Sequence, residues 1–497
     1  MQQGVAKAAI CRQRFGADGV KDMSILPMFW DTARGRNDLG TGPVCRSGPG
    51  GDEVMRGNAM KFMTARAALA VALSTGLAAG SVLLSAAPAI AKEKEAPKGG
   101  TYSKEFIAVA GPVQKLVQDA QAAKAKGTPD AQIKATLGGA AEAVAKVEAA
   151  AKTGQDKLAA GQFAVQLGGF LEDNAMRSRG IRNMIDSGLL EPDKIPTFNF
   201  YLGNFAYSAK DFQGAIEPLT KAIQGNVTED AAAEMLADSY TQLGKPAEGI
   251  AALKMAYDAR KAAGGNVPEN WYTRAKIIAY KAKLGPQAIE WSTLEVAAQP
   301  TALNWLGAGQ LAREFGGFAK EESLDLGRLF LRSGALDNDK QYVAREFIEY
   351  VQAADPRRLP GETVKIIELG LSKGALDASD VFVSDSLAQA KGRIAADKAS
   401  LVGLEKDARA AADGKLAVAT ADAYLSYDNP AKAEELYQLA LTKGGTFDMD
   451  RAETRLGIAQ LDQDKFDAAK ASFAKVGGVR APLARLWSVL ADQKAKP

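Results

Sequence analysis

The sequence predicts an all-α chain built from helix–turn–helix units, and three observations lead to this class. The chain of 497 residues is rich in alanine and only 7% aromatic, and alanine favours helices because it loses no side-chain entropy there. No run of alternating Val, Ile and Thr residues indicates a strand. Residues 198–257 read as two helix–turn–helix units that superpose at an offset of 34 residues.

Residues 60–91 have the layout of a secretory signal peptide. Lys61 and Arg66 form a basic start, residues 67–87 are apolar and small, and Ala89-Ile90-Ala91 has the A-x-A pattern of a cleavage site. We therefore expect cleavage after Ala91 and a periplasmic or secreted protein with no stable membrane span after cleavage. An uncleaved membrane anchor is the alternative, because the apolar run approaches the roughly 20 residues that a span needs.

Residues 1–59 precede this signal and show no sustained hydrophobic period. We interpret them as an over-extended gene start or a disordered leader, the alternative being an unusually long n-region or a small cytoplasmic tail. Cys11 and Cys45 lie here, so neither is expected in the mature chain. Residues 92–497 carry 52 Lys and Arg residues against 53 Asp and Glu residues, and this balance argues against nucleic acid as a partner.

The composition narrows the chemistry that the chain can perform. It has no histidine, and beyond residue 60 it has no cysteine, so imidazole bases, thiol nucleophiles and zinc sites with His or Cys ligands are excluded there. No P-loop or EF-hand pattern is present. We expect no catalytic residues, no metal site, no cofactor and no enzymatic activity, and an enzyme that relies on carboxylates is the least favoured reading.

The mature chain begins with a linker and N-terminal helices over 92–153. Residues 92–100 are charged and contain Pro and Gly, as is typical of a mobile linker. The apolar spacing predicts one helix over 103–123 and a second that starts at Pro129-Asp130 and continues to about residue 151.

Three units then run in phase within residues 154–330. Each unit has a leucine followed by a small residue, and then small or apolar residues at +13, +17 and +20 from that leucine. The three pairs that start the units are Leu167-Gly168, Leu202-Gly203 and Leu236-Ala237. Ala275 and Leu306-Gly307 continue this phase loosely. Residues 331–412 predict irregular helical hairpins, including an exposed, charged helix over 391–412. Four glycines there and elsewhere suit the left-handed position that ends a helix: Gly188, Gly334, Gly374 and Gly444.

The same phase returns over residues 413–478. Thr420-Ala421 and Leu456-Gly457 have matching residues at the same three offsets and lie 36 residues apart. Residues 479–497 form a last helix and a tail, and we expect the helix over 480–492 to cover the open end of the array.

A helix–turn–helix period of 34 residues with small residues at these positions resembles the tetratricopeptide repeat (TPR) family. The resemblance covers about residues 154–478, clearly in five units and loosely between 300 and 412. It implies a TPR-like α-solenoid with irregular central hairpins, and a non-repeating helical bundle is the alternative.

The resemblance also implies a partner-binding groove lined by the first helices of the units. The candidates are Phe200, Tyr201, Asn204, Tyr207, Ser208, Asp238, Thr241, Gln242, Arg274, Tyr280 and Lys281. Asn204 matches a position at which the family often holds a ligand's backbone. Phe200 stands where the family's carboxylate clamp needs a lysine, which argues against that ligand. Tyr201, Phe205 and Phe212 also suit packing between helices.

From these features we expect a non-catalytic scaffold of the bacterial cell envelope that binds a protein or peptide. The alternative is an accessory factor of peptidoglycan or envelope assembly that binds glycan or an envelope enzyme through the same surface.

Overall fold

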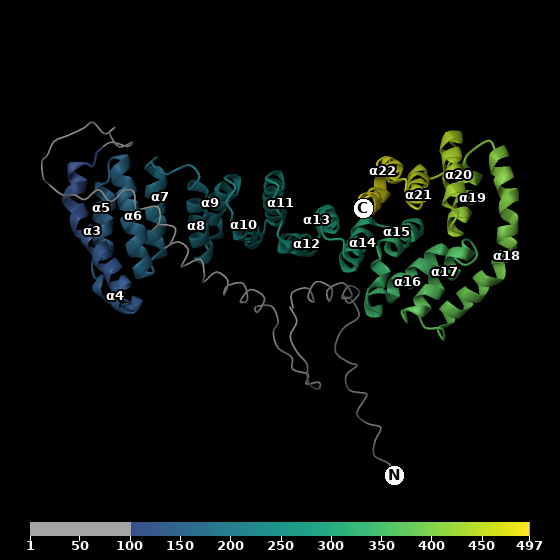
Figure 1. The fold of residues 1–497 in the computed structure, drawn as a ribbon, viewed down its shortest axis with the longest axis horizontal. Coiled ribbons are helices and arrows are strands. Elements are labelled where there is room, and N and C mark those ends of the chain that lie inside the picture. The colour runs from purple at the N-terminus through teal and green to yellow at the C-terminus, as the bar shows by residue number, and fades with distance from the viewer. Residues whose placement is uncertain (1–100, 497) are drawn as a thin grey trace, which may run out of the picture. The chain divides into compact units, whose positions relative to one another are not determined.

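The computed structural model describes residues 101–496, and these residues are all-α, with no strand among them. Consecutive helices pack in pairs and form the TPR-like array that the sequence predicts (Figure 1). The predicted leader, the signal peptide at 60–91 and both cysteines lie outside the described residues. By their contacts the described residues form two units, which we call the N-terminal unit (101–287) and the C-terminal unit (288–496).

The N-terminal unit contains ten complete helices. They are α3 (Lys104–Ala125), α4 (Asp130–Thr136), α5 (Ala140–Ala150), α6 (Gly154–Leu171), α7 (Asn174–Asp186), α8 (Ile195–Ser208), α9 (Phe212–Gln224), α10 (Ala231–Gln242), α11 (Pro246–Ala262) and α12 (Glu269–Lys281). Helix α13 (Gly285–Ala298) contains the boundary between the units.

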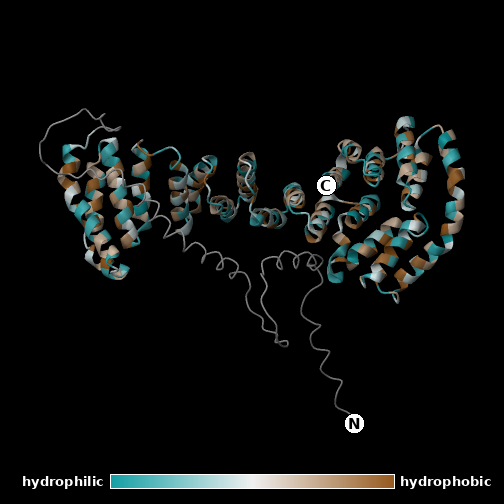
Figure 2. Ribbon diagram, in the orientation of Figure 1, coloured by the Kyte–Doolittle hydropathy of each residue, from teal (hydrophilic) through white to brown (hydrophobic). Residues whose placement is uncertain are grey.

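The remaining helices belong to the C-terminal unit. They are α14 (Ala302–Gly316), α15 (Lys320–Ser333), α16 (Lys340–Ala354), α17 (Pro360–Ser372), α18 (Val381–Ala410), α19 (Lys415–Ser426), α20 (Pro430–Lys443), α21 (Met449–Leu461), α22 (Phe466–Phe473) and α23 (Ala481–Lys494). Two short 3-10 helices, η4 (Ala335–Asp337) and η5 (Gly478–Arg480), join them. Figure 2 shows hydrophobic and hydrophilic residues alternating around most helices of the chain, as is typical of helices that pack on one side.

Small residues at the crossing points determine how closely the paired helices approach. A Cβ atom on Gly203 of α8 would lie 2.4 Å from Cγ of Leu219 on α9, and one on Gly457 of α21 would lie 2.4 Å from the Phe473 ring on α22. These are the residues at the predicted offsets, so the five in-phase units are confirmed as five tightly packed pairs: α6/α7, α8/α9, α10/α11, α19/α20 and α21/α22.

The helix ends also follow the sequence pattern. The four glycines predicted to end helices all have positive φ angles, from 65° at Gly374 and Gly444 to 77° at Gly334. Only glycine adopts this conformation without steric cost.

Three predictions about helices were wrong. The helix expected from Pro129 to about residue 151 is broken into α4 and α5, because Gly139 adopts a φ of +76° and precedes the first residue of α5. The phase assigned to Leu306-Gly307 is also displaced: a Cβ on Gly307 would meet no atom within 4 Å, whereas one on Gly309 would lie 2.2 Å from the Phe330 ring. The exposed helix expected over 391–412 starts earlier, at Val381.

The C-terminal unit closes on itself. The helix predicted over 480–492 is present as α23, but it packs against α14 and α15 as well as α22, and Gln493 donates a hydrogen bond to the carbonyl of Val296 at 2.6 Å. It therefore completes a closed arrangement, whereas the sequence suggested that it would cover an open end.

A buried network of charged residues connects the inward sides of α15, α17, α19 and α21. Asp325 is fully buried and accepts hydrogen bonds from Arg328 at 3.1 Å, Arg455 at 3.0 Å and Arg480 at 2.7 Å. Burial alone would raise the pKa of the Asp325 carboxyl, but the three guanidinium groups outweigh burial and hold this pKa well below its usual range.

The same arginines reach the other helices of the unit. Arg455 also donates to Asp422 on α19 at 2.6 Å, and Arg328 donates to Glu362 on α17 at 2.6 and 2.8 Å. Each buried charge therefore has partners on other helices, so the network holds together segments up to 155 residues apart in the chain.

Gly203→Ala tests whether close helix approach is a condition of this fold. The added methyl group has no room against Leu219, so we expect a loss of about 1–3 kcal/mol in the free energy of unfolding, measured by urea denaturation. Gly169→Ala on α6 is the matched control, because a Cβ there meets nothing within 4 Å. This control should leave stability unchanged or raise it by up to about 1 kcal/mol. Equal effects of the two substitutions would contradict the packing argument.

Candidate functional site

The first helices of three successive pairs, α8, α10 and α12, carry the predicted binding residues and bring some of them together. Helix α8 packs against α10 as well as against its own partner α9, and α9 packs against α11. First helices therefore follow one another on one side of the stack. Side chains one repeat apart can meet there.

Tyr207 of α8 and Asp238 of α10 form the first contact between repeats. The Tyr207 hydroxyl donates a hydrogen bond of 2.6 Å to Oδ2 of Asp238. Burial raises the pKa of the Tyr207 hydroxyl, and the neighbouring Asp238 carboxylate raises it further. The tyrosine therefore stays protonated and acts as a hydrogen-bond donor. Oδ1 of Asp238 accepts no hydrogen bond from any described residue.

Glu234 of α10 connects the second and third helices of the series. Arg274 of α12 donates to it at 3.0 Å, and the Asn270 amide donates to its other oxygen at 2.6 Å. The Arg274 and Glu234 side chains are 26% and 14% exposed, so a partner can still reach the pair. Nε of Arg274 is buried and has no hydrogen-bond partner among residues 101–496.

These contacts place polar side chains of three successive first helices beside one another. We call this surface the first-helix face and define it by the residues Asn204, Tyr207, Glu234, Asp238, Asn270 and Arg274. It carries two carboxylates and one guanidinium. The guanidinium of Arg274 pairs with Glu234, and Asp238 accepts the hydrogen bond from Tyr207. Since the bonds run between repeats, they fix the spacing of the three helices as well as the side chains.

Of the other predicted polar residues, Ser208 bonds to a residue of this face. Ser208 is exposed and donates to Oδ1 of Asn204 at 3.3 Å. Thr241 is half-buried and donates to the carbonyl of Ala237 within its own helix. Gln242 and Lys281 are exposed. Tyr280 is half-buried, with Nζ of Lys283 5.0 Å from the centre of its ring.

Two of the predicted aromatic residues, unlike these polar ones, pack inside the structure. Phe200 and Tyr201 are only 4% and 6% exposed and pack against each other with ring centres 5.5 Å apart. Phe205 is also buried, beneath the guanidinium of Arg177 at 4.5 Å, and Phe212 packs against the Tyr207 ring. In this structure, therefore, Phe200 and Tyr201 belong to the packed interior and are not available to a ligand.

Sequence reasoning missed two residues of the face, Glu234 and Asn270. They lie 36 residues apart, and Glu234 and Arg274 lie 40 apart, both close to the length of one repeat. Complementary polar residues about one repeat apart are the sequence signal that would have identified them. The prediction relied instead on positions at which the TPR family binds ligands.

The chemistry that this surface offers is hydrogen bonding. Within residues 101–496 no group of three or more Asp or Glu residues is arranged to hold a metal ion. The face presents donors and acceptors on a fixed backbone, which suits recognition of another polar chain.

Comparisons with known proteins add little to this description. No family model matches the chain, and no curated protein matches it. Among solved structures, it is similar to a chain of the Naa15/Naa10 complex bound to HypK-THB, with 14% identity over 76% of this chain and 70% of that chain and a TM-score of 0.28.

Two structures of the human IFIT1 dimer are also similar. The one with PPP-AAAA shows 15% identity over 68% of this chain and 85% of that chain, with a TM-score of 0.19. The one with m7Gppp-AAAA shows 13% identity over 76% and 80%, with a TM-score of 0.19. At such low TM-scores these likenesses carry no argument about function or partner.

Proposed function

We propose that this chain is a non-catalytic scaffold that binds a protein or peptide segment along the first-helix face. One observation carries the proposal: three successive first helices are joined by bonds between repeats, Tyr207 to Asp238 and Arg274 to Glu234. A partner that lies across them meets a surface whose side chains are already ordered. Little conformational entropy is then lost on binding.

The face also retains hydrogen-bonding capacity that its internal contacts do not use. Oδ1 of Asp238 has no donor among the described residues, and the Asn204 amide group donates to none of them. An acceptor and a donor on neighbouring first helices are what a peptide backbone requires, since each residue carries one N–H and one C=O. The mixed charges of the face favour such a partner over nucleic acid.

The non-catalytic part of the proposal is supported by composition and by where the perturbed carboxylates lie. Residues 61–497 contain neither histidine nor cysteine. Asp325, a fully buried acid whose pKa is lowered, is surrounded by three arginines within the C-terminal unit. A carboxylate held ionised and enclosed in this way stabilises structure and does not exchange protons with a substrate.

We place this scaffold in the bacterial cell envelope on the strength of the export pattern at residues 60–91. In the part of the chain that the structure describes, no helix is both long and apolar enough to cross a membrane. The alternative function also requires an envelope location. In that case the chain is an accessory factor of peptidoglycan or envelope assembly that binds glycan or an envelope enzyme.

Photo-crosslinking tests the binding face directly. A benzoylphenylalanine placed at Ser208 or Gln242, both exposed beside the face, should give the same discrete protein adduct in intact cells. Placed at Glu217 on α9 or Glu248 on α11, both exposed on second helices, it should give none.

Adducts of equal yield from all four positions would contradict a face-specific partner. Retention of the purified protein on protein-free peptidoglycan, with no adduct from Ser208 or Gln242, would replace the proposal with the glycan alternative.

N-terminal sequencing of the mature protein tests the proposed location. Cleavage after Ala91 predicts that the chain isolated from cells starts at Lys92, because signal peptidase cuts after the A-x-A pattern. A chain that starts at Met60 or Met1 would contradict export by this route.

A further inference from the structure

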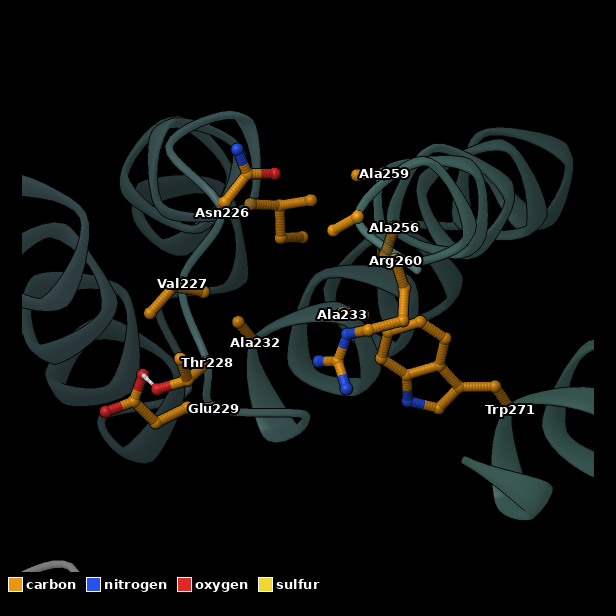
Figure 3. Close-up of a pocket in the computed structure, with 12 residues that line it drawn as sticks. Asn226, Val227, Thr228, Glu229, Ala232, Ala233, Ala256, Ala259, Arg260 and Trp271 are labelled. Atoms are coloured by element: carbon orange, nitrogen blue, oxygen red, sulfur yellow. Dashed lines mark hydrogen bonds between the residues drawn. The ribbon is translucent and has the colours of Figure 1, made fainter. Parts of the chain in front are cut away.

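A pocket of about 310 Å³ opens on the N-terminal unit. It is formed by the loop between α9 and α10, the start of α10, the second half of α11 and Trp271 at the start of α12 (Figure 3). No residue of the first-helix face lines it. The pocket is therefore a separate feature of the same stack.

The pocket exists because one repeat lacks a side chain that fills the equivalent space in the preceding repeat. In the α8/α9 pair, Pro196 covers the end of α9, where a Cβ on Gly225 would lie 2.4 Å from the proline ring. At the 34-residue offset the equivalent residues in the α10/α11 pair are Asp230 and Ala259. Asp230 pairs with Arg260 at 2.6 Å instead, so the space beside Ala259 stays open.

Most of the wall is apolar and small. The pocket is lined by four alanines and two larger apolar residues, namely Ala232, Ala233, Ala256, Ala259, Ile223 and Val227. Leucine-sized side chains at the alanine positions would fill the space. Burial of an apolar group in this cavity removes its surface from water without displacing protein atoms, and that is the main source of favourable free energy for such a ligand.

The polar groups on one side of the pocket are hydrogen-bond donors. Trp271 is 2% exposed, and its indole Nε1 is buried with no hydrogen-bond partner in the described part of the chain. The Arg260 guanidinium lies over the same ring at 5.5 Å. Figure 3 shows the indole and the guanidinium on one side of the pocket and the 226–229 loop on the other. An indole N–H can only donate, so a ligand that satisfies it must supply an acceptor oxygen.

The charges around the pocket indicate that this acceptor is neutral. Glu229 lines the pocket and Asp230 lies beside it, so two carboxylates accompany the single guanidinium of Arg260. An anionic ligand would meet a net negative charge, whereas an amide carbonyl would not. The volume lies at the lower end of the range for ligand pockets, which suits one side chain with its peptide group rather than a cofactor.

We propose that this pocket holds an apolar side chain, of leucine or phenylalanine size, from a partner polypeptide, with the adjacent backbone carbonyl accepting a hydrogen bond from Nε1 of Trp271. The proposal rests on the proposed scaffold function and adds an anchor point outside the first-helix face. The ligand has two defined parts, an apolar group and a neutral acceptor, so each part can be tested separately.

Nuclear magnetic resonance of the full-length ¹⁵N-labelled protein tests the pocket with single-residue probes. The indole N–H signal of Trp271, one of five tryptophans in the chain, is assigned by its loss in Trp271→Phe. N-acetyl-leucinamide and N-acetyl-phenylalaninamide should shift this signal in a saturable manner. N-acetyl-asparaginamide has the same backbone carbonyls but a polar side chain, so its affinity should be at least about tenfold lower. The affinity of the free acid N-acetyl-leucine should be lowered to the same extent.

Two variants supply the matched control on α11. Ala259→Leu fills the pocket and should weaken the binding of N-acetyl-leucinamide by about tenfold or more. Ala251→Leu places the same side chain at an exposed position of the same helix and should leave binding unchanged. Unaltered signals of the other tryptophans in Ala259→Leu establish that the variant is folded.

Three results would overturn the proposal: no shift of the Trp271 signal at the solubility limit of either probe, wild-type affinity in Ala259→Leu, or tighter binding of the free acid than of the amide. None of these bears on the crosslinks expected at Ser208 and Gln242. Failure of the pocket and failure of the scaffold function are therefore distinguishable.

Discussion

The structure depends on the close approach of two helices at each small-residue crossing. Where Gly203 meets Leu219, or Gly457 meets Phe473, there is no room for one additional carbon atom. This contact sets the distance and angle within a pair, and the repetition of the pair places first helices on one side and second helices on the other. The first-helix face follows from this geometry, because residues about one repeat apart then come within hydrogen-bonding distance.

The two units use their inward polar side chains in different ways. In the C-terminal unit, Asp325, Arg328 and Arg455 are at most 1% exposed and bond to one another and to neighbouring helices. Charges buried at this depth are tolerated only because each has partners, and partners that are already engaged cannot serve a ligand. In the N-terminal unit, the contacts of Tyr207 with Asp238 and of Arg274 with Glu234 remain partly exposed and incompletely satisfied. The N-terminal unit is therefore where we place the binding surface.

The parts of this architecture that depend on local sequence could be predicted. The five in-phase pairs, the helix start at Ser103 and the glycine helix ends follow from spacing and from backbone conformations that only certain residues adopt. The break at Gly139 was missed because the apolar period continues through it from Ile133 to Val147. Of the candidate site, Tyr207 and Asp238 meet as residues of neighbouring first helices should, and Arg274 meets Glu234, which was not predicted. Phe200 and Tyr201 are buried and pack against each other.

The remaining features depend on residues far apart in the chain, where no periodicity operates. Arg480 reaches Asp325 across 155 residues, and the pocket at Trp271 exists because a proline in one repeat has no counterpart in the next. Native-state hydrogen exchange of the wild-type protein and of Asp325→Asn tests the resulting account most directly. We predict that amides of α14, α15, α21 and α23 exchange through one shared opening reaction in the wild-type protein. Asp325→Asn should lower the free energy of this opening, and the amides of all four helices should show the same decrease. If α21 and α23 exchanged independently of α14 and α15, or if Asp325→Asn affected α15 alone, the closed C-terminal unit, and with it the assignment of binding to the N-terminal unit, would be contradicted.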